Sequence, residues 1–204
     1  MKKKIIGLVL CSILLVYFIG GIIYNFVLKQ DDIIEETEKK STNTIKGYDY
    51  LLYDDDLDIY KFEFDKLKKN LESKDINYKE YAYSISKMFI IKLYSLDNMN
   101  NKYDIKATEF IYPDARENFE LNIINTLNKY IEDNSDGNRK QELPLVQEVI
   151  IENDEEINFK IGEEEFDAYK INLSIKYKKD LGYDEKAELV IVKSDKYLYI
   201  VEKN

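Results

Sequence analysis

The sequence predicts an α+β domain that follows an N-terminal membrane span. Three observations lead to this fold class. The run of residues 5–28 contains no Asp, Glu, Lys or Arg. After it, apolar residues first recur with the period of a helix. From about residue 145 onward they recur with the period of a strand, and helices followed by short-looped strands indicate an antiparallel sheet with helices packed on it.

The predicted span has 24 residues, which as a helix reach about 36 Å and cross a hydrocarbon core of about 30 Å. Residues 2–4 are all lysine, whereas only Lys29 follows the span before two aspartates. The positive-inside rule therefore predicts a single-pass protein of the cell membrane. Residues 1–4 form a cytoplasmic tag, residues 5–28 the transmembrane helix, and the rest of the chain is extracytoplasmic.

Two other interpretations of this segment are less consistent with the residues. A cleaved signal peptide has an apolar region of about 7–15 residues and a small-residue cleavage site, but this run is longer and no such site closes it. Lipidation at Cys11 requires a small residue before the cysteine, and Leu10 is bulky. We therefore expect an uncleaved anchor with Cys11 among the lipid tails.

Composition limits the chemistry that the exterior part can perform. The chain has 204 residues and no histidine, and its one cysteine lies in the predicted span. Catalytic triads with an imidazole base and zinc sites built from His and Cys are therefore excluded, as is a disulfide within the domain. A hydrolase here would depend on paired carboxylates, Lys or Tyr with strongly shifted pKa values.

The exterior part is acidic. Without the lysines of residues 2–4 it holds 27 Lys and Arg against 40 Asp and Glu, a net charge of about −13. This charge repels nucleic acid and anionic lipid headgroups, and it favours solubility and a basic partner. The 18 tyrosines are no evidence of an aromatic binding surface, because the abundance of Lys, Ile, Asn and Tyr is typical of an AT-rich genome.

We expect a juxtamembrane spacer over residues 29–57, because residues 29–32 and 35–40 are mostly charged and residues 41–44 are small and polar. A first helix is predicted over 57–73, with Asp55 or Asp56 as its cap. Its apolar stripe consists of Tyr60, Phe64, Leu67 and Leu71.

A second helix is predicted over 77–96, where Asn77 and Glu80 resemble a capping box. Its expected buried face consists of Tyr78, Tyr81, Ala82, Ile85, Phe89, Leu93 and Leu96. A third helix opens at Pro113 and is expected to run past Ile131, because residues 119, 123, 127 and 131 are all apolar.

Five strands are predicted in the second half, at 145–152, near 157–161, around 169–177, at 186–193 and at 196–202. The alternation of apolar and polar residues is clearest from Tyr169 to Tyr177, which is typical of a half-buried antiparallel strand. Turns are expected at Asn153-Asp154, Gly162, residues 180–182 and Ser194-Asp195. The predicted domain, 58–204, thus has three helices on a curved sheet of four to five strands.

No catalytic, cofactor-binding or metal residue is predicted. The acidic runs 54–56, 152–156 and 163–165, and the loop Asp97 to Asp104, lack the spacing of a calcium loop. We interpret them as a helix cap and solvated turns. Spacing in sequence singles out no carboxylate pair, and phosphate-binding loops and nucleophile elbows are absent.

One further candidate is the segment from Asn138 to Pro144, which connects the helical half to the sheet and holds Arg139, one of two arginines. One interpretation is a docking loop on a rigid scaffold. The favoured interpretation is a crossover loop whose arginine pairs with a neighbouring acid.

The chain resembles membrane-anchored NTF2-like proteins, which include the VirB8-like subunits of secretion and conjugation machines in Gram-positive bacteria. The resemblance rests on the order of tag, span and helices-then-sheet domain. Three phrases, 94–98, 110–114 and 137–144, are also similar to uncharacterised Firmicute anchored proteins. The resemblance implies an NTF2-like or cystatin-like fold with a conical cavity. Some members use this cavity as enzymes and others serve only as scaffolds, so no residue roles carry over.

These observations predict a non-enzymatic scaffold or protein-interaction domain, held outside the membrane and belonging to a cell-envelope or secretion assembly. The expected partners are the membrane, through residues 5–28, and a protein partner or a second copy of the chain, with no nucleic acid and no cofactor. The alternative is a small-ligand or peptide binding protein that uses the cavity, and a weaker alternative is a carboxylate-based enzyme.

Overall fold

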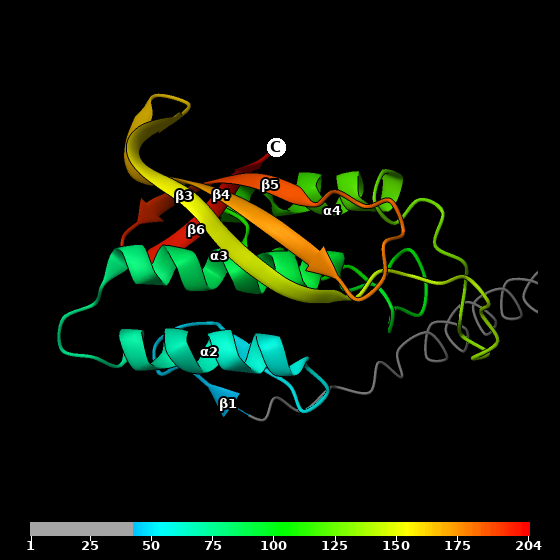
Figure 1. The fold of residues 1–204 in the computed structure, drawn as a ribbon. Coiled ribbons are helices and arrows are strands. Elements are labelled where there is room, and N and C mark those ends of the chain that lie inside the picture. Colours follow the sequence, from blue (N-terminus) through cyan, green and yellow to red (C-terminus); the bar gives the residue numbers. More distant parts are fainter. Residues whose placement is uncertain (1–42) are drawn as a thin grey trace, which may run out of the picture. The chain divides into compact units, whose positions relative to one another are not determined.

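The computed structural model describes residues 43–204 (Figure 1). The predicted tag 1–4, the predicted span 5–28 and the first part of the predicted spacer lie outside the described residues. Among the helices of residues 43–204, none has the length and apolarity that crossing a membrane requires.

The described residues form an α+β domain with three helices and a four-stranded antiparallel sheet, as predicted. The helices are α2 (Asp58–Leu71), α3 (Tyr78–Tyr94) and α4 (Arg116–Asn125), with two short 3-10 turns, η1 (Thr108–Phe110) and η2 (Pro113–Ala115), before α4. The strands are β3 (Val146–Ile161), β4 (Glu164–Tyr177), β5 (Lys186–Ser194) and β6 (Tyr197–Lys203), paired in this order.

Helix α3 is the central element of the fold. It packs against β3, β4 and β6 on one side and against α2 on another, and Figure 1 shows it between α2 and the sheet. Small residues at buried positions, Ser84 and Ser86, allow neighbouring elements to approach its backbone, and the Ser86 hydroxyl donates to the carbonyl of Ala82. Helix α2 therefore stacks on α3, not directly on the strands.

The two predicted caps have different outcomes. The Asn77 side chain accepts from the backbone N–H of Glu80, as the capping-box pattern predicted. The prediction for α2 was wrong, because its N-cap is Leu57 and no side chain caps it. Asp56 instead accepts from the backbone N–H of Tyr53 and so closes the turn before the helix.

The domain begins earlier than the predicted boundary at residue 58. Two short paired strands, β1 (Asn43–Thr44) and β2 (Leu51–Leu52), form a hairpin within the predicted spacer. Ile45 and Tyr50 of this segment are 1% and 3% exposed. The Tyr50 hydroxyl lies 2.7 Å from that of Tyr81 on α3, so this segment belongs to the folded domain and contributes Ile45 and Tyr50 to its core.

The third helix is shorter than predicted. Helix α4 ends at Asn125 and is followed by turns, so Leu127 and Ile131 lie beyond it. The side chains of Asn125 and Thr126 bond to carbonyl oxygens four residues back, at Leu121 and Asn122. Such side-chain bonds compete with the helical backbone pattern and favour termination.

The sheet has four strands, because the two strands predicted at 145–152 and 157–161 are one. Strand β3 is continuous through Asn153-Asp154, and the predicted turn there is a register irregularity between Ile151 and Asn153. The long β3–β4 hairpin closes at Gly162, whose φ of +62° suits glycine. The β5–β6 turn lies one residue later than predicted, at Asp195 and Lys196, and Ser194 is the last residue of β5.

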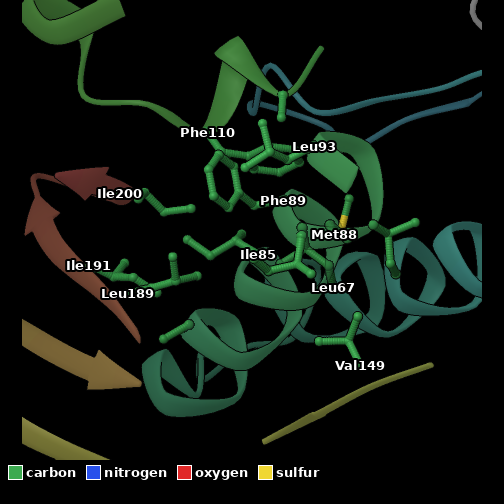
Figure 2. Packing of buried hydrophobic residues seen from close by; sticks show 14 of the residues in the cluster. Leu67, Ile85, Met88, Phe89, Leu93, Phe110, Val149, Leu189, Ile191 and Ile200 are labelled. Carbon is green, nitrogen blue, oxygen red and sulfur yellow. The ribbon is translucent and has the colours of Figure 1, made fainter. Parts of the chain in front are cut away.

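The main core lies between α3 and the sheet. Figure 2 shows Ile85 and Phe89 of α3 gathered with Ile191 of β5 and Ile200 of β6. Phe110 from η1 meets Phe89 edge-on, with ring centroids 6.4 Å apart. These side chains are fully buried, and aromatic pairs of this geometry add to the stabilisation that burial provides.

A candidate docking groove

Three loop segments that are distant in the sequence meet at one end of the β3–β4 hairpin. They are the loop after α3, the crossover loop that leads into β3, and the loop after β4. Between them lies an open groove of about 550 Å³. It is lined by Asp97, Gln141, Glu142, Leu143, Leu145, Lys178, Lys179 and Leu181.

The crossover loop is firmly attached to its surroundings through Arg139. The guanidinium of Arg139 donates to the carbonyl oxygens of Met99, at 2.6 Å, and Asp97, at 2.8 Å. The predicted partner of Arg139 was an acid, and this was wrong: the arginine ties the loop to the main chain of the loop after α3. Pairing with neutral carbonyls holds two loops together without neutralising a nearby carboxylate.

Further hydrogen bonds fix both ends of the same loop. The Gln141 side chain accepts from the backbone N–H of Glu132 and donates to the carbonyl of Tyr130. The carbonyl of Pro144 accepts from Leu96, at 2.9 Å. Backbone groups held in this way are pre-organised, so a bound partner does not have to order the loop.

The groove combines an apolar floor with a charged rim. Leu143, Leu145 and Leu181 are half-buried and supply the apolar surface. On the rim, Lys179 pairs with Glu142. Lys178 is exposed, and within residues 43–204 its ammonium takes part in no ion pair. The groove thus offers apolar contact together with an uncompensated cation.

The acidic runs form no metal site in the described part of the chain, where no cluster of three or more metal-ligating side chains occurs. Asp154 is engaged by Lys79 and by the Tyr83 hydroxyl. Glu163–Glu165 lie at the turn and start of β4, where they are exposed. The loop from Asp97 to Asp104 lies beside the groove, but of its acids only Asp97 lines it.

One cluster bears on the carboxylate-enzyme alternative. Glu109 pairs with Lys92 at 2.7 Å, and the Lys92 ammonium lies over the Tyr60 ring, 4.6 Å from its centroid. Burial raises the pKa of Asp56, and the negative charge of nearby Glu109 adds to this shift. Lys92 in turn lowers the pKa of Asp56 and pairs with Glu109, an arrangement that suits an ion pair linking α3 to η1 better than acid–base chemistry.

The small-ligand alternative needs a cavity, and the space between α3 and the sheet is filled by the protein's own side chains. Tyr50, Phe89, Phe110 and Ile191 are at most 3% exposed and fill the space between α3 and the sheet. A ligand there would have to displace close-packed side chains. This would lower the free energy of unfolding by several kcal/mol, about as much as a large-to-small core substitution. The groove therefore remains the best candidate site.

Protein-family models, curated proteins and solved structures were all compared with this sequence, and none matches it. The groove must therefore be interpreted from its own residues. Sequence reasoning identified one wall, the segment from Asn138 to Pro144, but it missed Lys178, Lys179 and Leu181. A pairing of the 145–152 and 169–177 strands, which the sequence analysis did not predict, would have placed these residues beside the loop.

Proposed function

We propose that this chain is a membrane-anchored interaction protein whose NTF2-like domain, outside the membrane, docks a protein partner in the groove. The anchor rests on the charge-free run of residues 5–28 and the lysines before it. The groove carries the docking proposal, because it is the place where a rigid loop, apolar surface and an uncompensated charge coincide.

The chemistry of the groove favours an extended protein segment with an apolar side chain next to an acidic one. The apolar side chain would lie on Leu143, Leu145 and Leu181, and the acid would meet Lys178. A purely apolar occupant would leave this cation without a counter-charge, and a purely acidic one would gain nothing from the leucines. Interfaces of this kind join an apolar centre to a charged rim that fixes register and speeds association.

Site-specific photocrosslinking in cells tests the proposal. A photoreactive amino acid at position 181 should trap a protein partner in a discrete adduct on irradiation. The matched control carries the same group at Tyr130, which is 76% exposed and does not line the groove. Equal trapping at the two positions, or none at position 181 in a chain present at normal levels in the membrane, would refute docking in this groove.

A further inference from the structure

The turn of the β3–β4 hairpin carries a strongly acidic short segment. Within residues 162–167 there are four acids, Glu163, Glu164, Glu165 and Asp167, and no base. Ile161 and Phe166 flank the turn and are half-buried. The tip of the hairpin therefore presents acidic residues beside apolar ones, which is the chemistry that the groove favours.

The tip also extends beyond the rest of the sheet. The last residue pair between β4 and β5 is Ala168 with Val192, so β3 is the only strand paired with residues 164–167 of β4, and the Phe166 ring lies against Tyr112. Figure 1 shows this end of the hairpin curling away from α3. The tip is thus a two-stranded arm whose β4 edge from 164 to 167 is unpaired within the sheet and accessible to another chain.

The loops that build the groove have the opposite charge. Residues 138–145 and 176–181 hold five bases and two acids, and the third segment adds Asp97, so the three loops together carry a net charge of +2. The whole of residues 43–204 carries 24 Lys and Arg and 35 Asp and Glu, a net charge of −11. A locally basic surface in a strongly acidic domain attracts acidic surfaces, and the hairpin tip, at −4, is one.

The tip and the groove lie at opposite ends of the same hairpin. Val146 and Tyr177 pair at the groove end, and Ile161 and Glu164 pair at the tip. The 16 residues of β3 span about 50 Å at roughly 3.3 Å per residue. Since a hydrogen-bonded hairpin cannot fold back over that length, the tip of a chain cannot enter its own groove.

We propose that the hairpin tip of one copy docks into the groove of a second copy. This inference rests on the proposed function, in that it names the partner of the same groove. Ile161 or Phe166 would contact the leucines of the floor, and Glu163–Glu165 would face Lys178 and its basic neighbours. The contact is head-to-tail, so repetition closes a ring or extends a chain of copies in the membrane.

Cysteine crosslinking of the full chain in membranes tests this arrangement. In a Cys11→Ser background, which removes the only native cysteine, two differently tagged chains are co-expressed. One carries Glu164→Cys and the other Lys178→Cys, and mild oxidation should give a dimer that contains both tags. Each variant with itself should give at least about fivefold less dimer, because head-to-tail docking brings tip to groove and never tip to tip.

The matched control replaces Lys178→Cys with Lys74→Cys, an equally exposed lysine in the turn between α2 and α3. If the mixed dimer is no more abundant than in the control, self-docking is overturned. Tip-to-tip dimers as abundant as the mixed dimers would also overturn it. If photocrosslinking at position 181 still traps another protein, the proposed function survives and only the inference fails. If it traps nothing, both fail.

Charge reversal gives a second readout that does not depend on cysteine reactivity. Lys178→Glu with Lys179→Glu should weaken self-association of the purified chain at least about tenfold, and Lys69→Glu with Lys74→Glu on the α2 side should not. Combining the groove reversal with Glu163→Lys and Glu164→Lys at the tip should restore association. If the groove reversal and the tip reversal each weaken association and their combination does not restore it, direct contact between tip and groove is contradicted.

Discussion

A three-residue contact joins α3 to the irregular point of β3, and it allows a quantitative test of the fold. Asp154, whose side chain is 17% exposed, accepts from the Tyr83 hydroxyl and pairs with the Lys79 ammonium at 2.7 Å. Asn153-Asp154 was predicted as a turn, and the contact explains why the strand continues: the carboxylate is held against α3 just after the register shift.

Tyr83→Phe isolates the tyrosine's part in this contact. It removes one hydroxyl that donates to a charged acceptor, and Lys79 still satisfies the carboxylate. Hydrogen bonds to charged groups contribute about 1.5–3 kcal/mol, and partial exposure of Tyr83 reduces this, so we expect a loss of about 1–2 kcal/mol. For a domain of this size the midpoint of thermal unfolding should fall by roughly 2–8 °C.

The assay is urea unfolding of the full chain in mild detergent, followed by near-UV circular dichroism of the tyrosines. Tyr130→Phe is the matched control, since Tyr130 is 76% exposed, and it should unfold like the wild type. If Tyr83→Phe loses no more stability than Tyr130→Phe, the hydroxyl contributes nothing and the reasoning is refuted.

The same contact predicts a dependence on pH. Lys79 and then Tyr83, by hydrogen bonding, lower the pKa of Asp154. A carboxyl whose pKa is lowered by folding contributes stability above its unfolded pKa of about 3.9, and this contribution is lost as pH falls through the folded value. The difference between wild type and Tyr83→Phe should therefore be complete at pH 7 and shrink in acid.

Three further predictions test the core, a helix cap and the topology. Phe110→Ala should cost about 3–5 kcal/mol in urea unfolding, because the ring is fully buried against Phe89, whereas Phe62→Ala, at 60% exposure, should cost far less. Asn77→Ala removes the cap of α3 and should cost about 1 kcal/mol by the same measurement, and Asn77→Asp should retain most of it. External protease added to intact cells should degrade residues beyond 28, and protection of the domain in intact but not lysed cells would contradict the predicted orientation.

The fold class was predictable because its signals are local. One local pattern marks the buried face of a helix, the stripe of Tyr60, Phe64 and Leu67. Another marks the face of a strand that packs on the core, the alternation from Tyr169 to Tyr177. The burial of Ile45 and Tyr50 was not predictable in the same way. The apolar residues of segment 45–53 follow neither the helix nor the strand period, and only the contacts of Ile45 and Tyr50 with α3 and the rest of the core show that they belong to it.

The groove was only partly predictable, for a different reason. Its walls come from residues near 97, 141–145 and 178–181, and no local pattern links them. A pairing of the two long strands in the correct register places Val146 opposite Tyr177 and so brings the second and third segments together. The turn predicted at Asn153 prevented this inference. A strand that ends there determines neither the length of the hairpin nor which loops lie at its two ends.

Arg139 shows why rigidity, more than charge, supports a role for the loop. Had it paired with an exposed acid, as predicted, the pair would contribute roughly 0–1 kcal/mol and would weaken in salt. Two bonds to the carbonyl oxygens of Met99 and Asp97 involve a neutral partner, so they depend far less on ionic strength. The loop should therefore hold its shape at high salt while contacts across the Lys178 rim weaken. Salt that dissociates copies without altering the near-UV spectrum would separate the rigid scaffold from the electrostatic contact that it presents.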